Sequence, residues 1–260
     1  MSFRPQVVSA VLLTAVLGAS SPLLAQDPFE QEVYSPSIAA PGEWELEAHT
    51  NYVARGSTAF DGARAPTDRQ TRVTLELTHG LSGLVEVAAY GLAAARPGAG
   101  LELAGWRFRA GIRAPDQWGL PVQLAVNLEV EHTRPLFAER ENAVELVPIV
   151  GWRRGPLALA MTFPLEHAIG GGAVPGWEIE PAARADVTLS PAITLTTEYF
   201  SSLGELGHLD PPAERRRMLF PGIAMHLGDD ITWNAAVGFG LTDAADRLIL
   251  KTAFEFPLHE

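Results

Sequence analysis

The chain has 260 residues, among them 24 glycines and 20 prolines, and it contains no cysteine. Its formal net charge of −12 at pH 7 argues against a nucleic-acid partner, because binding to phosphates needs a basic surface. Beyond the N-terminal region, no stretch approaches the roughly 18 consecutive apolar residues of a membrane-spanning helix. If the chain enters a membrane, it does so as a β-barrel.

The first 25 residues have the layout of a secretory signal peptide. Arg4 supplies a positive charge, an apolar stretch runs from Val7 to about Leu17, and small residues near Ala25 suit a cleavage site. The apolar stretch is too short for a spanning helix or membrane anchor. We therefore predict export, cleavage after Ala25, and a short periplasmic segment, 26–42, ahead of the folded domain.

From residue 43 onward, apolar and polar residues alternate in one segment after another. Side chains of an extended strand point alternately to opposite faces, so each segment is a strand with one apolar and one polar face. Residues 121–131, PVQLAVNLEVE, show the pattern most clearly. In chain order, the twelve apolar faces begin at Trp44, Val73, Val85, Ala104, Val122, Val144, Leu157, Trp177, Ile193, Leu219, Ile231 and Leu248.

The connections between these strands alternate in length. The predicted short ones are 79–83, 114–120, 153–156, 188–191 and 228–230. The predicted long ones are 53–69, 91–101, 132–142, 167–176, 201–215 and 240–247. Most strands are nine to eleven residues long, as a tilted strand needs to cross a bilayer. Long loops at one end and tight turns at the other are typical of an outer-membrane barrel.

The apolar faces are expected to point outward, toward lipid. A ring of twelve strands is too wide for inward apolar side chains to fill, whereas charges in a watery lumen need no desolvation. Aromatic residues then fall near strand ends, as in interfacial girdles. The alternative, in which they pack a sandwich core, stays open. These aromatics are Trp44, Trp152, Trp233, Phe254 and Phe256 at one end and Tyr52, Trp177 and Tyr199 at the other.

Inward-facing charges are the candidate pore-lining residues. They are Arg107, Arg109, Glu129, Glu131, Glu145, Glu178, Glu180 and Arg184. Pairing of the fourth and fifth strands predicts that Arg107 lies opposite Glu129 and Arg109 opposite Asn127. The same reasoning sets Phe220 opposite Gly238. Because carboxylates are in excess, a mild preference for cations is expected.

The sequence offers little support for catalysis or metal binding. Ser201 and Ser202 are close in sequence to Glu198 and His208, but no GxSxG motif is present and a polar loop explains them better. The pairs Glu131–His132 and Glu166–His167 match no ligand spacing. We therefore expect no cofactor, no metal and no enzymatic activity.

Three segments resemble bacterial outer-membrane transporters linked to the meta-cleavage pathway of phenol degradation. They are PGEWELEAHTNYV (41–53), HGLSGLVEVAAYGL (79–92) and NAAVGFGLTDAADRLILKTAFEF (234–256). The resemblance covers roughly residues 40–256. It implies a pore or uptake channel for small molecules, and the pathway hints at apolar aromatic solutes.

Together these observations predict an all-β protein, a twelve-stranded antiparallel up-and-down transmembrane β-barrel over residues 43–256, with a tail at 257–260. The expected function is passive transfer of small molecules across the bacterial outer membrane. Expected partners are outer-membrane lipids, lipopolysaccharide, the barrel-assembly machinery and small solutes. The alternatives are an outer-membrane enzyme that modifies lipid and a structural barrel without an open pore.

Overall fold

The computed structural model describes residues 29–60, 62–170, 176–228 and 231–258. The predicted signal peptide and its cleavage site therefore lie outside the described residues. In this part of the chain, no helix has the length and apolar character needed to span a membrane.

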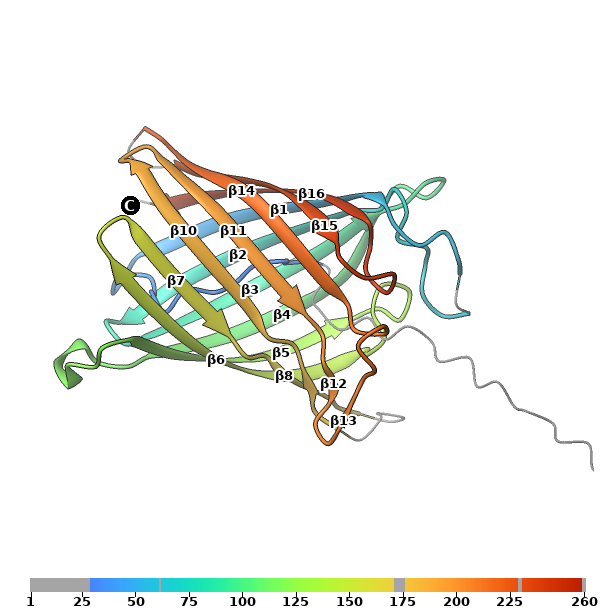
Figure 1. The fold of residues 1–260 in the computed structure, drawn as a ribbon, viewed down its shortest axis with the longest axis horizontal. Helices are drawn as coiled ribbons and strands as arrows, with labels where there is room; N and C mark the ends of the chain where they lie inside the picture. The colour runs from blue at the N-terminus through green and yellow to red at the C-terminus, as the bar shows by residue number, and fades with distance from the viewer. Residues whose placement is uncertain (1–28, 61, 171–175, 229–230, 259–260) are drawn as a thin grey trace, which may run out of the picture.

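Twelve antiparallel strands form a closed barrel, as predicted (Figure 1). Neighbouring strands follow chain order, and pairing of the first strand with the last closes the ring. The uninterrupted strands contain 9 to 13 residues. In chain order the barrel strands are β1 (Trp44–Arg55), β2 (Thr71–Ser82), β3 (Val85–Ala95), β4 (Leu101–Arg113), β5 (Gln123–Thr133), β6 (Asn142–Arg154), β7 (Leu157–Thr162) with β8 (Leu165–Ala168), β9 (Glu178–Ile179) with β10 (Ala182–Ser190), β11 (Ile193–Ser201), β14 (Arg217–Leu227), β15 (Ile231–Gly240) and β16 (Leu248–Leu258).

Two barrel strands are interrupted, each at a proline. Pro164 separates β7 from β8, and Pro181 separates β9 from β10. Proline has no N–H to donate to a ladder, so regular pairing stops there and resumes beyond it. The carbonyl oxygens of both prolines still accept hydrogen bonds from neighbouring strands, from Glu180 and Ser201 respectively. The wall therefore stays continuous.

Loops differ strongly between the two ends of the barrel. At the short-turn end lie the tight connections, among them 83–84, 155–156 and 191–192, together with the short 3-10 helix η1 (Asp116–Trp118). At the long-loop end, the connection from β11 to β14 contains the hairpin β12 (Gly204–Glu205) and β13 (His208–Leu209). β12 pairs with β9, so the hairpin extends the wall beyond the barrel.

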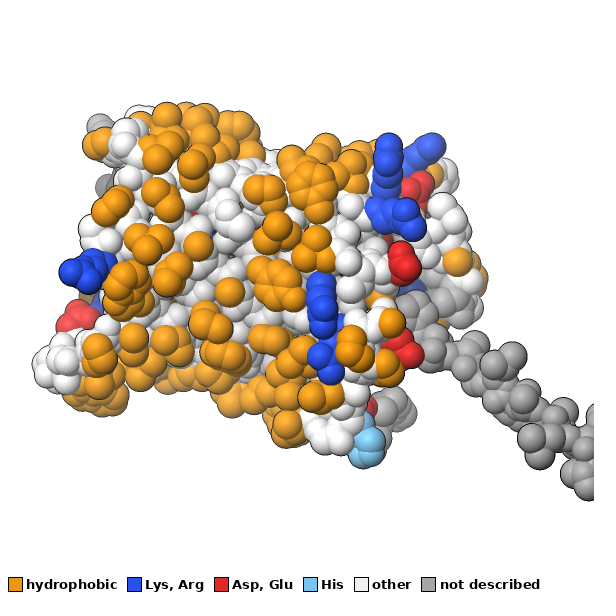
Figure 2. Space-filling view, viewed as in Figure 1, with side chains coloured by type: hydrophobic (Ala, Val, Ile, Leu, Met, Phe, Trp, Pro, Cys, Tyr) orange, Lys and Arg blue, Asp and Glu red, His pale blue; other side chains and the backbone are white. Residues whose placement is uncertain are grey.

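The two faces of the wall have the predicted polarity. Apolar side chains such as Leu75, Phe108 and Leu128 are exposed on the outside, whereas Asn127 and Glu129, beside Leu128 on the same strand, are buried inside. Figure 2 shows hydrophobic side chains over the wall and charged ones gathered near its ends. This is the reverse of a soluble protein, and it matches a barrel surrounded by lipid.

Strand register differs from the prediction at the fourth hairpin. Arg107 lies opposite Glu131 and Arg109 opposite Glu129, two residues away from the predicted pairing. The connection between β4 and β5 runs through η1 and is centred one residue later than the sequence indicated. Because side chains alternate with a period of two, a shift of two residues keeps every charge on the inner face.

Other turns also lie at positions different from those predicted, while one predicted packing contact is confirmed. β3 continues to Ala95, so the predicted long loop 91–101 is reduced to residues 96–100. β2 likewise continues through most of the predicted turn at 79–83. Phe220 does pack against Gly238, where any added Cβ would overlap its ring. Turn positions depend on few residues, which makes them harder to locate than strands.

Candidate functional site

The N-terminal segment, residues 29–41, lies inside the barrel and is the central feature of the lumen (Figure 1). Its backbone is bound by inward side chains along the whole barrel. Near the long-loop end, the carbonyl oxygen of Phe29 accepts hydrogen bonds from Asn51 at 3.0 Å and Thr74 at 3.1 Å. Near the short-turn end, the amide of Ala39 donates to Glu86 at 2.8 Å.

This placement differs from the predicted periplasmic position of segment 26–42. The segment has no strand periodicity, so its sequence does not reveal where its backbone groups find partners. In the middle of the barrel the carbonyl oxygen of Gln31 accepts from Lys251, and the amide of Val33 donates to Glu198 at 3.3 Å. The polar inner wall thus replaces water as the partner of buried backbone groups.

Arg107 connects the N-terminal segment to the wall. Its guanidinium lies 2.9 Å from Glu30, 2.9 Å from Glu131 and 3.3 Å from Glu129. Its side chain is 2% exposed. One buried cation is therefore shared among three carboxylates, two from β5 and one from the inserted segment.

Arg109 has the same role nearer the short-turn end. It lies 2.5 Å from Glu76 and 3.4 Å from Glu86. Its guanidinium also lies over the rings of Tyr34, at 5.1 Å, and Tyr90, at 5.7 Å. The cation–π contact with Tyr34 stabilises the inserted segment, whereas Tyr90 belongs to β3 of the wall.

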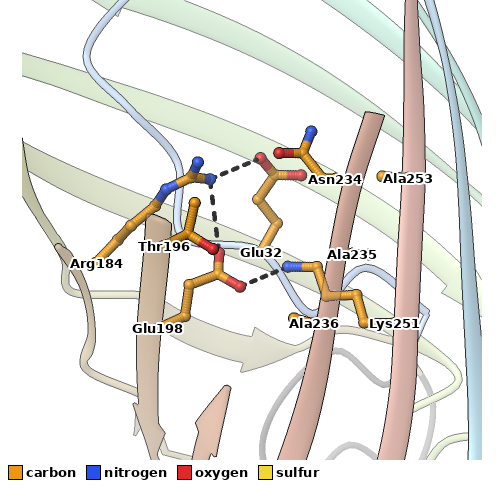
Figure 3. Close-up of a pocket in the computed structure, with 9 residues that line it drawn as sticks. All are labelled: Glu32, Arg184, Thr196, Glu198, Asn234, Ala235, Ala236, Lys251 and Ala253. Carbon is orange, nitrogen blue, oxygen red and sulfur yellow. Dashed lines mark hydrogen bonds and ion pairs between the residues drawn. The ribbon is translucent and has the colours of Figure 1, made fainter. Parts of the chain in front are cut away.

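A third set of charges lies on the opposite wall (Figure 3). Glu198 of β11 lies 2.7 Å from Lys251 and 3.7 Å from Arg184, and Arg184 lies 3.9 Å from Glu32 of the inserted segment. The cavity beside them measures about 10 Å³. That volume holds about one water molecule, so this cavity is too small for an organic solute.

Arg140, in the loop between β5 and β6, binds the acidic residues near the long-loop end. It lies 2.5 Å from Glu178 and 2.9 Å from Glu166. Burial acts to lower the pKa of Arg140, but the hydrogen bond to Glu178 and the charge of Glu166 outweigh it and raise the pKa well above its usual value. The guanidinium is therefore charged at every accessible pH.

A second small cavity, of about 50 Å³, lies between the segment and the wall. Glu145 of β6 and Glu180, between β9 and β10, both line it, and Tyr34 closes one side. Like the first cavity, it offers space for a few waters only.

All eight candidate residues from the sequence lie on the inner side of the barrel, but they do not form one ring. Arg107, Glu129 and Glu131 meet directly, whereas Arg109 pairs with Glu76 and Glu86. The remaining four lie at separate places, Glu145 and Glu180 at the second cavity, Glu178 at Arg140, and Arg184 at Glu198.

Several charged residues of the lumen were not among the eight candidates. Alternation does place Glu76, Glu86, Glu198 and Lys251 on polar strand faces, but it does not indicate that they hold the inserted segment. No such signal exists for the residues of the inserted segment or for Arg140, because their positions depend on tertiary structure.

Apolar side chains close the long-loop end of the lumen. Phe29 packs edge-on against Phe137 of the loop between β5 and β6, with ring centroids 6.2 Å apart. Tyr90 and Leu92 of β3 are buried in the same cluster. The inner face of β3 is therefore apolar in this half, although the sequence analysis expected a polar lumen throughout.

The serine and histidine residues considered for catalysis do not come together. The Ser201 hydroxyl donates to the carbonyl oxygen of Ser202, and the Ser202 hydroxyl accepts from the amide of Arg216. His208 is exposed on β13. Among the described residues, no hydrogen bond joins either serine to His208 or Glu198, so no nucleophile–base pair is formed.

Comparison with known proteins identifies the architecture. No family model matches the chain, and no curated protein matches it either. The COG4313 outer membrane channel from Pseudomonas putida F1 is similar in structure, with a TM-score of 0.60 and 11% identity over 88% of this chain and 100% of that one. The chain has the fold of an outer-membrane β-barrel.

Two porins share this fold. The KdgM porin has a TM-score of 0.58 and 8% identity, covering 83% of this chain and 99% of that one. The NanC porin has a TM-score of 0.52 and 8% identity, covering 83% of this chain and 100% of that one. At such identities the likeness concerns the fold, and the function must be argued from this chain's own lumen.

Proposed function

We propose that the protein is a channel of the bacterial outer membrane through which small molecules pass by diffusion. The observation that carries this proposal is a lipid-facing barrel whose interior is lined by charged and polar side chains. Such an interior is suited to water and solutes. Export by the predicted signal peptide, folding by the barrel-assembly machinery, and contact with outer-membrane lipids and lipopolysaccharide belong to the same proposal.

Passage requires the N-terminal segment to move. The cavities of about 10 and 50 Å³ beside it are too small for an organic solute. Its described contacts to the wall include hydrogen bonds, ion pairs, the cation–π contact of Tyr34 with Arg109, and packing of Phe29 and Val33. Water can replace the polar contacts when the segment leaves, so displacement leaves the wall charges solvated.

The lumen favours solutes that are neutral or cationic and partly apolar. One similar structure is the KdgM porin in complex with disordered oligogalacturonate, an acidic oligosaccharide. The carboxylates of Glu76, Glu129 and Glu145 would repel such a ligand here. When Phe29 leaves with the segment, the apolar residues that it contacts, among them Tyr90, Leu92 and Phe137, instead suit an aromatic ring, in line with the resemblance to transporters linked to phenol degradation.

Conductance of the refolded mature protein in a planar bilayer, recorded in a salt gradient, tests the proposal. We expect infrequent openings between closed periods, with reversal potentials that indicate cation preference. A folded protein that never conducts and never passes aromatic solutes into liposomes would favour the structural barrel. Release of fatty acid from lipid would favour the enzyme.

Two carboxylates near the long-loop end should set part of the ion selectivity. Replacing Glu178 and Glu180 with glutamine removes two negative charges and leaves Arg140 less compensated. Cation preference should therefore fall, measured as a smaller reversal potential in the same salt gradient. Asp243→Asn, an exposed carboxylate of the loop between β15 and β16, is the control and should change little. Equal selectivity in all three proteins would contradict the role assigned to Glu178 and Glu180.

Lipid contact can be tested with two leucines that are equally exposed. Leu128, in the middle of β5, and Leu209, in the β13 hairpin beyond the barrel, are each 53% exposed. Leu128→Arg should lower the free energy of unfolding in bilayers by about 2–4 kcal/mol, as at the membrane midplane. Leu209→Arg should cost under about 1 kcal/mol. Equal losses in denaturant titrations would mean that the outer face of β5 does not meet lipid.

A further inference from the structure

His49 of β1 is a buried histidine surrounded by carboxylates. Its side chain is 2% exposed and points into the lumen. Glu47 Oε2 lies 3.2 Å from its Nε2, and Glu32 Oε2, from the inserted segment, lies 3.6 Å from its Nδ1. Each ring nitrogen therefore faces a different carboxylate.

His49 and Glu47, together with Glu76 of β2, are arranged as metal ligands. One ligand atom each from Glu47, His49 and Glu76 lies within 4.8 Å of the other two. Two ligands that share one Zn²⁺ lie at most about 4.2 Å apart. Small side-chain rotations therefore bring all three into coordination.

The hydrogen bonding of His49 and Glu76 is consistent with a bound cation. Nε2 of His49 is buried and, among the described residues, is not satisfied by a well-formed hydrogen bond, although Oε2 of Glu47 lies 3.2 Å away. Arg109 and the Thr78 hydroxyl both contact Glu76 through Oε1, so neither of these contacts uses its Oε2.

Charge balance supports the same conclusion. The arginines near the cluster are already divided among other carboxylates. Arg107 is shared by three and Arg109 also contacts Glu86. Within the described part of the chain, Glu47 forms an ion pair with His49 alone. Burial of several carboxylates with so little compensation is costly unless a cation joins them.

We propose that a divalent transition-metal ion, with Zn²⁺ as the probe, binds between Nε2 of His49 and the carboxylates of Glu47 and Glu76. An imidazole nitrogen with two carboxylate oxygens is a common donor set for such ions, and water would complete the coordination. Glu32, whose Oε2 lies 3.6 Å from Nδ1 of His49, would move slightly closer to accept from Nδ1–H as an outer carboxylate, the usual partner of a metal-bound histidine. Binding of the ion would therefore also hold the inserted segment to β1.

Metal binding is tested without any transport measurement, so its outcome is independent of the proposed channel function. The mature protein is purified in detergent, stripped with EDTA and titrated with Zn²⁺ by calorimetry. Folding is checked by its heat-dependent migration on gels. We expect one Zn²⁺ per barrel, and with Co²⁺ an absorption spectrum typical of nitrogen and oxygen ligands.

Four variants separate the roles of the residues. His49→Ala and Glu47→Gln should each weaken Zn²⁺ binding by at least about 100-fold, since each removes a direct ligand, and Glu32→Gln should weaken it by about 10–100-fold. His208→Ala, an exposed histidine on β13, should bind as the natural protein does. If one ligand variant fails to fold, the other decides.

Two results would overturn the proposal. One is folded natural protein that binds no Zn²⁺, which would indicate a protonated His49 bridging Glu32 and Glu47. The other is folded His49→Ala or Glu47→Gln protein that binds as tightly as the natural one, which would place the ion elsewhere.

Discussion

Deletion of residues 29–39 should turn a protein that is mostly closed into one that conducts steadily. The deleted residues occupy the lumen, and the cavities left beside them measure only about 10 and 50 Å³. Without the segment, water fills the barrel and ions can follow the inner charges. Planar-bilayer recordings should therefore show long-lived openings in place of brief ones.

The barrel should still fold after this deletion. Each strand pair keeps its hydrogen bonds, and the groups that lose a partner, such as Asn51 and Lys251, face the new water-filled space. Ser37→Ala, at an exposed position of the same segment, is the matched control and should conduct as the natural protein does. A folded deletion variant with unchanged conductance would show that the loops, not the segment, close the channel.

Replacement of Arg107 by methionine should cause the largest loss of stability of any single change in the lumen. Arg107 is buried and lies within 3.3 Å of Glu30, Glu129 and Glu131. Its loss leaves buried carboxylates near one another without that cation. Removing one partner of a buried ion pair costs about 3–5 kcal/mol, and denaturant unfolding in lipid vesicles should show a loss of that size.

Two further variants test the cause of this loss. Arg113→Met, at the short-turn end where Arg113 pairs with exposed Asp116, should cost under about 1 kcal/mol. Adding Glu129→Gln to Arg107→Met removes one uncompensated charge and should recover part of the stability. If the double variant is no more stable than Arg107→Met, lost packing rather than charge explains the effect.

The alternation of residues by itself determined which face of each strand meets lipid and which meets the lumen. This property is local, because side-chain direction in a strand has a period of two whatever the pairing. It survived a register shift of two residues between β4 and β5 that changed every individual partner of Arg107 and Arg109. The number of strands could be predicted from the sequence equally well, because each strand repeats the same local alternation.

Only the tertiary structure decided what fills the barrel. Residues 29–41 carry no periodicity, and their backbone could be solvated equally well in the periplasm. They lie in the lumen because side chains far away in sequence, on β1, β2, β4, β11 and β16, surround them with matching donors, acceptors and charges. Each contact depends on closure of the ring, which brings strands from both ends of the chain around one axis. The contacts of Arg107 with Glu30, and of His49 with Glu32, depend on the segment lying inside that ring and on no local pattern.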